Sequence, residues 1–213
     1  PGQGTATNLI ALSLIVNRAK RRKLKLYACF VDLKAVFDSV PRDLMWQKLE
    51  AWGIPTNLLQ AIKALYNNTW AQVKVSDGSK LTDKIKTSMG LKQGCVLAPS
   101  LFNLYLADLP SCLTPEQNIA PLLYSKYIDH LQYADDIVLL SHTPQGLQRT
   151  LDQFASYITA NRLEINIKKT QVMRLLDRTK YNLVWHIQKT SIKEVQSYKY
   201  LGVMVEQNFA YSS

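Results

Sequence analysis

The chain has 213 residues, 47% hydrophobic and 20% charged, a composition typical of a globular protein with a sizeable core rather than of a disordered segment. Its apolar runs are far shorter than the roughly 20 residues that a membrane-spanning helix needs, and no signal-peptide pattern opens the sequence, so we expect a soluble, intracellular protein, nuclear or cytoplasmic and not secreted. The net charge of +10 favours a polyanionic partner, nucleic acid more than an acidic membrane surface.

The first predicted elements are a helix and a basic segment. Residues 7–17 predict a helix, because apolar side chains recur at helical spacing after a Thr-Asn start. The segment RAKRRKLK at 18–25 then places six Lys or Arg in eight positions. It is interpreted either as a solvated loop or localisation-like patch, or as a surface that contacts nucleic-acid phosphates. The candidate phosphate contacts are Arg18, Lys20, Arg21, Arg22 and Lys23.

A strand and two helices are predicted next. Residues 25–33, KLYACFVDL, predict a strand that ends at Asp32. Pro41 opens a predicted helix over 41–52, and a second helix follows Pro55. The apolar side chains expected on the inner faces of these helices are Leu44, Leu49, Trp52, Leu58, Leu59, Ile62 and Leu65.

The rest of the chain mixes short helices with strand pairs. Because little room remains for right-handed β-α-β crossovers, the predicted fold is α+β, with an antiparallel sheet backed by helices. The predicted elements are a hairpin at 70–88 with its turn at 76–79, an apolar helix at 98–109, a strand–turn–strand at 131–140, a helix after Thr143-Pro144 and short strands within 170–176, 183–187 and 198–205.

The stretch LQYADDIVLL at 131–140 sets two adjacent carboxylates between segments typical of buried strands. A buried carboxylate is costly unless it is paired or bound to a metal, and neighbouring like charges repel. One interpretation is an exposed Asp-Asp turn. The other is that Asp135 and Asp136 bind divalent cations together with Asp32, since acids at the ends of two rigid strands are what a two-metal phosphoryl-transfer site requires.

The cysteines and histidines indicate no other site. The three cysteines include no C-x-x-C pair, and the three histidines have no metal-ligand spacing. We expect structural roles for Cys29, Cys95, Cys112, His130, His142 and His186.

Five motifs in chain order resemble the reverse-transcriptase domain of non-LTR (LINE-type) retrotransposons. They are FVDLKAVFDSV, GLKQGCVLAPSLFNLYL, YADD after an apolar strand, NRLEINIKKTQVM and YKYLGVMV, and the resemblance runs from about residue 2 to residue 205. It implies the palm of a right-hand polymerase with part of the fingers and without a thumb. The implied activity is RNA-directed DNA synthesis, in which a primer 3′-OH attacks the α-phosphate of a dNTP and pyrophosphate leaves.

The resemblance also implies a metal site with two Mg²⁺ ions, for which Mn²⁺ is a substitute. Asp32 and Asp135 would bridge the metals, Asp136 would be a supporting carboxylate, and the backbone carbonyl of Leu33 would complete the oxygen shell of one ion. Lys169, in KKT, matches a lysine proposed to protonate the departing pyrophosphate. From the sequence alone it is a surface lysine.

Other matched residues would contact the nucleotide. Phe37 matches the bulky residue that excludes a ribose 2′-OH and so selects deoxynucleotides, whereas its spacing alone favours a buried core aromatic. Gln93 and Gly94 match a Gln-Gly pair that lies along the nascent base pair, where glycine allows the backbone to approach closely. Tyr133 would pack near the terminal nucleotide of the primer.

The segment YKYLGV resembles a primer-grip hairpin, to which Tyr200, Leu201 and Gly202 would belong and in which the glycine permits a tight bend. Two residues depart mildly from the family pattern. Val36 stands where the family usually has Ala, and Lys92 stands where it usually has Arg.

The implied organisation is one reverse-transcriptase-like domain over 1–213. Fingers or palm-edge elements would lie at about 1–28 and 55–90, and the palm and primer-grip region at about 29–54 and 91–205. The expected partners are an RNA template, a DNA primer and a dNTP, with no membrane. Earlier fingers strands, a thumb and an endonuclease segment match nothing in the sequence, and we expect a longer parent protein to supply them.

A second interpretation is a domesticated or truncated reverse-transcriptase-like module that is catalytically weak or inactive and binds nucleic acid or a protein partner. The three carboxylates favour the enzyme, because a fold kept only for binding gains nothing from three costly charges. The missing thumb favours the module. A metal-dependent nuclease on a similar palm is a third alternative, and it leaves the Gln-Gly and YLGV motifs unexplained.

Overall fold

The computed structural model describes residues 4–72, 81–177, 179, 182–207 and 211–212. The chain forms two compact units. The first unit comprises Pro1–Lys34, Asp108–Ala160 and Glu164–Ser213, and the second comprises Ala35–Ala107 and Asn161–Leu163. The subdivision into fingers and palm segments stays a prediction.

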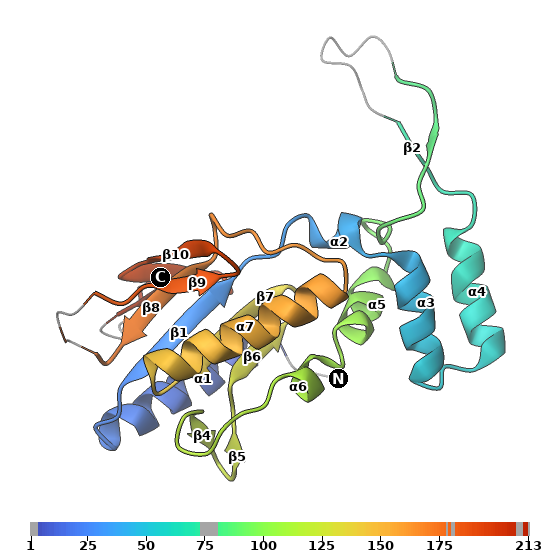
Figure 1. Cartoon of the computed structure of the whole chain (residues 1–213). Helices are drawn as coiled ribbons and strands as arrows, with labels where there is room; N and C mark the ends of the chain where they lie inside the picture. The colour runs from blue at the N-terminus through green and yellow to red at the C-terminus, as the bar shows by residue number, and fades with distance from the viewer. Residues whose placement is uncertain (1–3, 73–80, 178, 180–181, 208–210, 213) are drawn as a thin grey trace. The chain divides into compact units, whose positions relative to one another are not determined.

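A six-stranded sheet is the framework of the first unit (Figure 1). In spatial order its strands are β6 (His130–Tyr133), β7 (Asp136–Ser141), β1 (Leu26–Val31), β8 (Gln171–Leu175), β10 (Thr190–Glu194) and β9 (Trp185–Ile187). Every neighbouring pair is antiparallel except β8 and β10, which run parallel. In this register Phe30 lies opposite Val138 on one side and Gln171 on the other. The mainly antiparallel sheet confirms the predicted α+β class.

Two long helices, α1 (Thr5–Arg21) and α7 (Pro144–Ala160), cover the faces of this sheet. Side chains alternate across a strand, so the even-numbered residues of β1 point to one face, where they form a buried cluster with α1. The odd-numbered residues point to the other face, which α7 covers, in front of the sheet in Figure 1. The apolar side chains of α7 that are fully or almost fully buried are Leu147, Leu151, Phe154 and Ile158.

Smaller elements complete the first unit. A second sheet packs on the α1 face of the first, where the ring of Tyr198 stacks on Phe30 with the two centroids 4.4 Å apart. Its strands are β11 (Ser197–Tyr200), β12 (Val203–Glu206) and β13 (Tyr211–Ser212), and the other elements are α6 (Leu109–Cys112) and the paired strands β4 (Leu122–Leu123) and β5 (Lys126–Tyr127).

The second unit is mainly helical. Its elements are α2 (Val36–Ser39), α3 (Arg42–Ala51), α4 (Thr56–Tyr66), β2 (Trp70–Ala71), β3 (Ile85–Lys86) and α5 (Ala98–Tyr105). α3 packs against both α4 and α5, and β2 pairs with β3 in the predicted hairpin. The predicted turn at 76–79 lies outside the described residues.

Two helix boundaries differ from the sequence prediction. The basic segment continues α1 as far as Arg21, because Lys and Arg are good helix formers and only the residues after it leave the helix. The helix expected over 98–109 ends at Tyr105 and is followed by the short helix α6. No helix among the described residues is long and apolar enough to cross a membrane.

The inner faces of α3 and α4 were predicted only in part. Leu49 and Leu59 are buried as expected. Trp52, Leu58 and Leu65 are instead about half exposed, at 48%, 49% and 49%. Helical spacing shows which side chains share a face, but it cannot show whether another element covers that face.

Candidate active site

The first unit brings the predicted metal carboxylates together at one end of β1 and β7. Asp32 directly follows β1, and Asp136 is the first residue of β7. The strands pair with Val31 opposite Ile137, so the next pair in the same register is Asp32 and Asp136. Asp135 lies in the two-residue turn that connects β6 to β7. Three acids from two distant segments of the sequence thus share one site.

The charges of these carboxylates act on one another and on a neighbouring tyrosine. Asp136 is exposed at the start of β7, yet its pKa is raised above its ordinary value, first by partial desolvation and then by the negative charges of Asp135 and Asp32. Burial, followed by the charges of Asp32 and Asp136, raises the pKa of Tyr198 to about 12. A divalent cation would relieve this repulsion, since a nearby opposite charge favours the ionised carboxylates.

Asp32 is held by a segment that lies far away in the sequence. Its backbone N–H donates to Thr170 Oγ1 over 3.2 Å, and its carbonyl oxygen accepts the N–H of Asn166 over 2.8 Å. Thr170 is fully buried, so its hydroxyl is a fixed acceptor. Lys169, the residue before Thr170, is exposed and lies in a turn. Its backbone N–H donates to the carbonyl of Asn166. The backbone therefore ties the turn of Lys169 to Asp32.

The oxygen donors suit a hard divalent cation without forming a closed ligand set. Carboxylate and carbonyl oxygens are the ligands that Mg²⁺ prefers. Leu33 forms a backbone bridge with Ile165 in which the hydrogen bonds are made by Asp32 and Lys34, so the Leu33 carbonyl stays outside this ladder. Among the described residues, no three Asp, Glu, His or Cys side chains already converge as metal ligands.

Two further predicted groups lie near these acids in the first unit. Tyr133 is 38% exposed at the end of β6, where it pairs with Asp136 across the hairpin. In the predicted primer-grip hairpin, Tyr200 is only 1% exposed and belongs to the buried cluster under α1. Leu201 and Gly202 form its two-residue turn with φ of 49° and 84°, the tight bend that the glycine predicted. Of the three predicted primer-grip residues, Tyr200 is therefore a core residue, and only Leu201 and Gly202 are accessible in the turn.

The second unit carries three of the four residues predicted to contact the nucleotide, and Tyr133 of the first unit is the fourth. Phe37 is half-buried in α2 and packs against Phe102 of α5, with ring centroids 5.2 Å apart. Gln93 is exposed, and its Nε2 donates to both carboxylate oxygens of Asp38, over 3.0 and 3.2 Å. Gly94 has a φ of 78° and open space where a Cβ would lie. Because Asp38 follows Phe37, the Gln-Gly pair and the predicted gate are linked within this unit.

Arg42 is a residue of the second unit that sequence reasoning missed. Its side chain is buried, and burial lowers the pKa of the guanidinium. Nε donates to the carbonyl of Gly90 over 2.8 Å, three residues before Gln93. The acceptors of Nη1 are the carbonyl of Tyr66, the hydroxyl of Thr69 and the carbonyl of Thr87, at 3.3, 2.7 and 3.0 Å. From the sequence, an arginine at the start of a helix is expected to lie in solvent. No local pattern indicates that its acceptors lie in distant segments.

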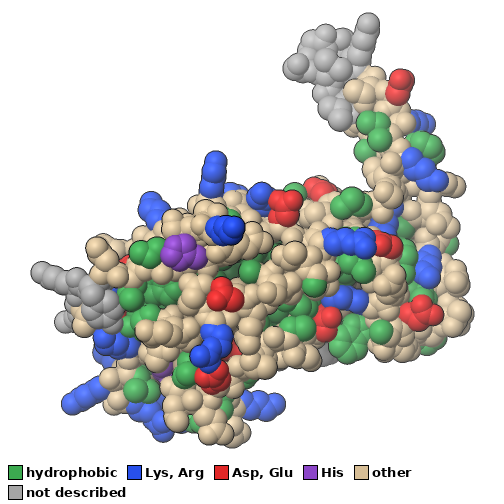
Figure 2. Space-filling model, viewed as in Figure 1, with side chains coloured by type: hydrophobic (Ala, Val, Ile, Leu, Met, Phe, Trp, Pro, Cys, Tyr) green, Lys and Arg blue, Asp and Glu red, His purple; other side chains and the backbone are tan. Residues whose placement is uncertain are grey.

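The basic segment lies at the opposite end of the first sheet. α1 ends just before β1 begins, whereas Asp32 follows the other end of β1. The six residues of β1 place the two ends roughly 20 Å apart, at about 3.3 Å per residue. Figure 2 shows Lys and Arg side chains protruding at the lower left, where α1 meets β1 in Figure 1. The basic run is thus not beside the carboxylates.

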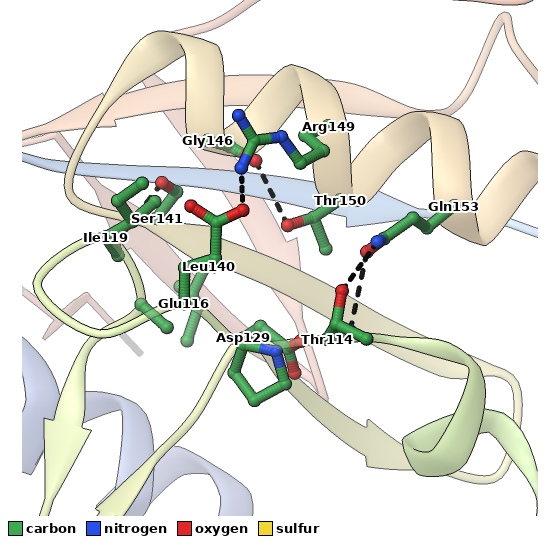
Figure 3. Close-up of a pocket in the computed structure, with 12 residues that line it drawn as sticks. Thr114, Glu116, Ile119, Asp129, Leu140, Ser141, Gly146, Arg149, Thr150 and Gln153 are labelled. Atoms are coloured by element: carbon green, nitrogen blue, oxygen red, sulfur yellow. Dashed lines mark hydrogen bonds and ion pairs between the residues drawn. The ribbon is translucent and has the colours of Figure 1, made fainter.

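A small polar pocket at the far end of the β6–β7 hairpin is also separate from the carboxylates (Figure 3). Arg149 of α7 forms an ion pair with Glu116 there. Asp129, which is 5% exposed, lines the pocket and contacts the His130 ring nitrogen over 2.7 Å. The pocket encloses about 10 Å³, room for about one water molecule and not for a substrate.

The arrangement of strands and acids agrees with what comparison with known proteins finds. A family model described as reverse transcriptase (RNA-dependent DNA polymerase) matches residues 1–205. The chain belongs to this family. Its YADD motif spans the end of β6, the two-residue turn and the first residue of β7.

Relatives of this reverse-transcriptase chain include proteins of mobile elements. The retrovirus-related Pol polyprotein from type-1 retrotransposable element R2 of Nasonia vitripennis is 28% identical over 211 residues, 94% of this chain and 20% of the relative. The RNA-directed DNA polymerase from mobile element jockey of Drosophila funebris is 26% identical over 214 residues, 98% of this chain and 22% of the relative. The chain thus spans about a fifth of the length of these relatives.

Among solved structures, apo telomerase from Candida Tropicalis resembles the chain in fold. The TM-score is 0.65 at 11% sequence identity, and the match covers 100% of this chain and 37% of the telomerase chain. A telomerase truncated from its C-terminal domain gives a TM-score of 0.66 at 12% identity. At such low identity the likeness concerns the fold alone.

Proposed function

We propose that this chain is the catalytic region of an RNA-directed DNA polymerase, which adds deoxynucleotides to a primer 3′-OH on an RNA template. The observation that carries the proposal is the meeting of Asp32, Asp135 and Asp136 at one end of β1 and β7, in a chain of the reverse transcriptase family. The mutual repulsion of these acids costs free energy of folding, and such a cost is typical of a functional site, in this case one that binds cations.

The metal ligands of the proposal are the carboxylates of Asp32, Asp135 and Asp136 and the carbonyl of Leu33. Mg²⁺, or Mn²⁺ in its place, would supply positive charge for the attacking oxygen and for the departing pyrophosphate. Oxygen donors on rigid strand ends match that role, and the Leu33 carbonyl lies outside the backbone ladder. The chain's own contribution is positioning, because Thr170 fixes the backbone of Asp32.

The proposed nucleotide contacts are Phe37, Gln93, Gly94 and Tyr133. Phe37 would exclude a 2′-OH by steric contact, and its packing on Phe102 holds the ring in place. The backbone of Gly94 is accessible, which suits close approach of a base pair. Lys169, exposed on its turn, would protonate the leaving pyrophosphate, since an ammonium group is a proton donor near a phosphate.

The proposed partners are an RNA template, a primer and a dNTP. The primer grip would be the turn at Leu201 and Gly202, since the ring of Tyr200 is buried. A longer parent protein would supply the remaining parts of the polymerase, consistent with relatives about five times as long as this chain. The net charge of +10 supports binding to nucleic-acid phosphates that weakens steeply with salt.

The test is primer extension on an RNA template with dNTPs and Mg²⁺, run beside the double variant Asp135→Ala, Asp136→Ala. We expect extension by the chain and a loss of at least about 100-fold in the variant, since loss of metal ligands should exceed the loss seen for their outer partners. If neither protein extends the primer while both bind RNA in a salt-sensitive manner, the enzyme proposal fails and a binding module remains.

A further inference from the structure

A hollow in the first unit lies between the last turns of α1 and the β4–β5 hairpin. It measures about 370 Å³, within the size range of pockets that bind small ligands. Its lining residues are Leu14, Arg18, Arg21, Arg22, Leu123 and Tyr124, and none of them is acidic. We call it the Arg–Tyr groove. It belongs to the end of the sheet roughly 20 Å from the carboxylates, by the length of β1 at about 3.3 Å per residue.

The hairpin holds an aromatic ring in solvent at this groove. Leu123 packs against the buried cluster under α1, which anchors the hairpin. The next residue, Tyr124, starts the two-residue turn to Lys126 with a φ of 53° and is 80% exposed. Its ring therefore contributes little to the core. An exposed aromatic ring is a surface on which a nucleic-acid base can stack.

The three guanidinium groups of the groove are not neutralised by acidic side chains among the described residues, so they can bind an anionic ligand. In the part of the chain that the structure describes, none of Arg18, Arg21 and Arg22 forms an ion pair. Arg21 Nε donates only weakly, over 3.4 Å, to the carbonyl of Asn17. The charge of Arg22 adds to the effect of burial in lowering the pKa of His142. Unpaired guanidinium groups are well suited to phosphate oxygens.

We propose that the Arg–Tyr groove binds single-stranded nucleic acid, with guanidinium groups on phosphates and one base stacked on Tyr124. A single strand is favoured over a duplex because paired bases hide the face that stacking needs. A nucleic-acid ligand is also favoured over a membrane. Membrane binding needs a broad apolar face, whereas this groove is recessed and offers three positive charges and one aromatic ring. The site would hold a strand away from the polymerase centre, and it does not depend on polymerase activity.

The test measures binding of the full chain to fluorescein-labelled oligo-uridine RNA, oligo-thymidine DNA and a duplex by fluorescence polarisation. We expect Tyr124→Ala to weaken single-strand binding about 5- to 100-fold, the scale of one stacked base, with an unchanged salt slope. Arg21→Gln should weaken it and reduce the salt slope by about 0.7, the value for one phosphate contact on a single strand. Comparison of RNA with DNA identifies the source of the strand.

The matched control is Lys20→Gln, which removes one charge from the same basic run. Lys20 lines a different hollow, together with the acidic Asp177 and Glu194, so its loss should matter less than that of Arg21. Equal effects of all three variants, or a preference for duplex or for phosphatidylserine vesicles, would overturn the proposal. Binding should persist in the Asp135→Ala, Asp136→Ala chain, so that a failure of the polymerase proposal is distinguishable from a failure of this one.

Discussion

Asp177 is a charged side chain that the first unit buries completely and satisfies with several partners. The hydroxyl of Tyr27 donates to it over 2.6 Å, the backbone N–H of Thr179 donates over 3.1 Å, and the Lys25 ammonium lies 3.2 Å away. Burial opposes ionisation, but the hydrogen bonds to Thr179, Tyr27 and Lys25 outweigh it and hold the pKa of Asp177 well below its ordinary value. The charge thus connects the start of β1 to the segment after β8.

The depressed pKa of Asp177 predicts a stability that depends on pH. Because the folded pKa lies below the unfolded one, the stabilisation is present above about pH 4 and is lost as the pH falls through the folded pKa. Asp177→Asn should therefore lower the free energy of unfolding by about 2 kcal/mol at pH 7 and by much less in acid. Urea unfolding at several pH values measures this, with Asp152→Asn on the exposed side of α7 as control. A deficit that stays constant with pH would contradict the account.

Single residues of the site were predictable where the signal is local. Asp32, Asp135 and Asp136 stand out because each is an acid at the end of a run typical of a strand. Thr170 and Arg42 were missed because each contacts a distant backbone group. Thr170 accepts the N–H of Asp32, 138 residues away, and Arg42 donates to the Gly90 carbonyl, 48 residues away. A threonine or arginine gives no sign in the sequence of which distant backbone group it will meet.

At the scale of elements, the loop before the Gln-Gly pair is packed tightly against α2. A Cβ on Gly90 would lie 2.8 Å from the carbonyl oxygen and 3.0 Å from the Cα of Asp38. Gly90 also has a φ of 81°. Gly53, after α3, has a similar φ of 75° but nothing within 4 Å of an added Cβ. Substitution of Gly53 would therefore introduce backbone strain alone, whereas substitution of Gly90 would introduce both backbone strain and a steric clash.

This contrast predicts unequal costs for the same substitution. Gly53→Ala should lower the free energy of unfolding by about 1 kcal/mol, the cost of a left-handed alanine. Gly90→Ala should cost about 1–3 kcal/mol more, because the backbone of Asp38 cannot yield as a flexible side chain would. Denaturant unfolding of the two variants gives the difference directly. Equal costs would show that the loop moves away freely and that the close approach is unimportant.

The elements themselves were largely predictable, and their boundaries and partners were less so. α7 follows from the spacing of its leucines and from Thr143, whose hydroxyl accepts the N–H of Gly146 at the helix start. The segment 18–21 was expected outside the helix because its charges suggested a loop. β10 was not predicted from the sequence. It pairs in parallel with β8, and parallel neighbours are not joined by a short turn that a sequence pattern could indicate.

At the scale of the whole molecule, composition indicated the class of partner but not where it binds. The charge of +10 indicated a nucleic-acid partner. The length of β1 separates the basic run from Asp32, and the pairing of β1 with β7 places Asp136 at the Asp32 end of the sheet. Phe37, Gln93 and Gly94, three of the four candidates for nucleotide contact, belong to the second unit, whereas Tyr133 and the three carboxylates belong to the first. Such a division follows from long-range contacts that a local pattern cannot report.

The central claim is that the carboxylates at the end of β1 and β7 carry out polymerisation. The measurement that tests it most directly is incorporation of a single dNTP opposite an RNA template by Asp32→Asn, compared with the chain itself and with Asp152→Asn. Each substitution exchanges one carboxylate for an amide of the same shape. Asp152 is exposed on α7 and has no part in the site, and RNA binding by all three proteins is measured in parallel.

We predict incorporation by the chain and by Asp152→Asn that requires Mg²⁺ or Mn²⁺ and stops when EDTA removes the metal. Asp32→Asn should incorporate at least about 100-fold more slowly while it binds RNA as well as the chain does. Incorporation by Asp32→Asn at the rate of the unsubstituted chain would contradict the assignment of these carboxylates as the metal ligands of a polymerase.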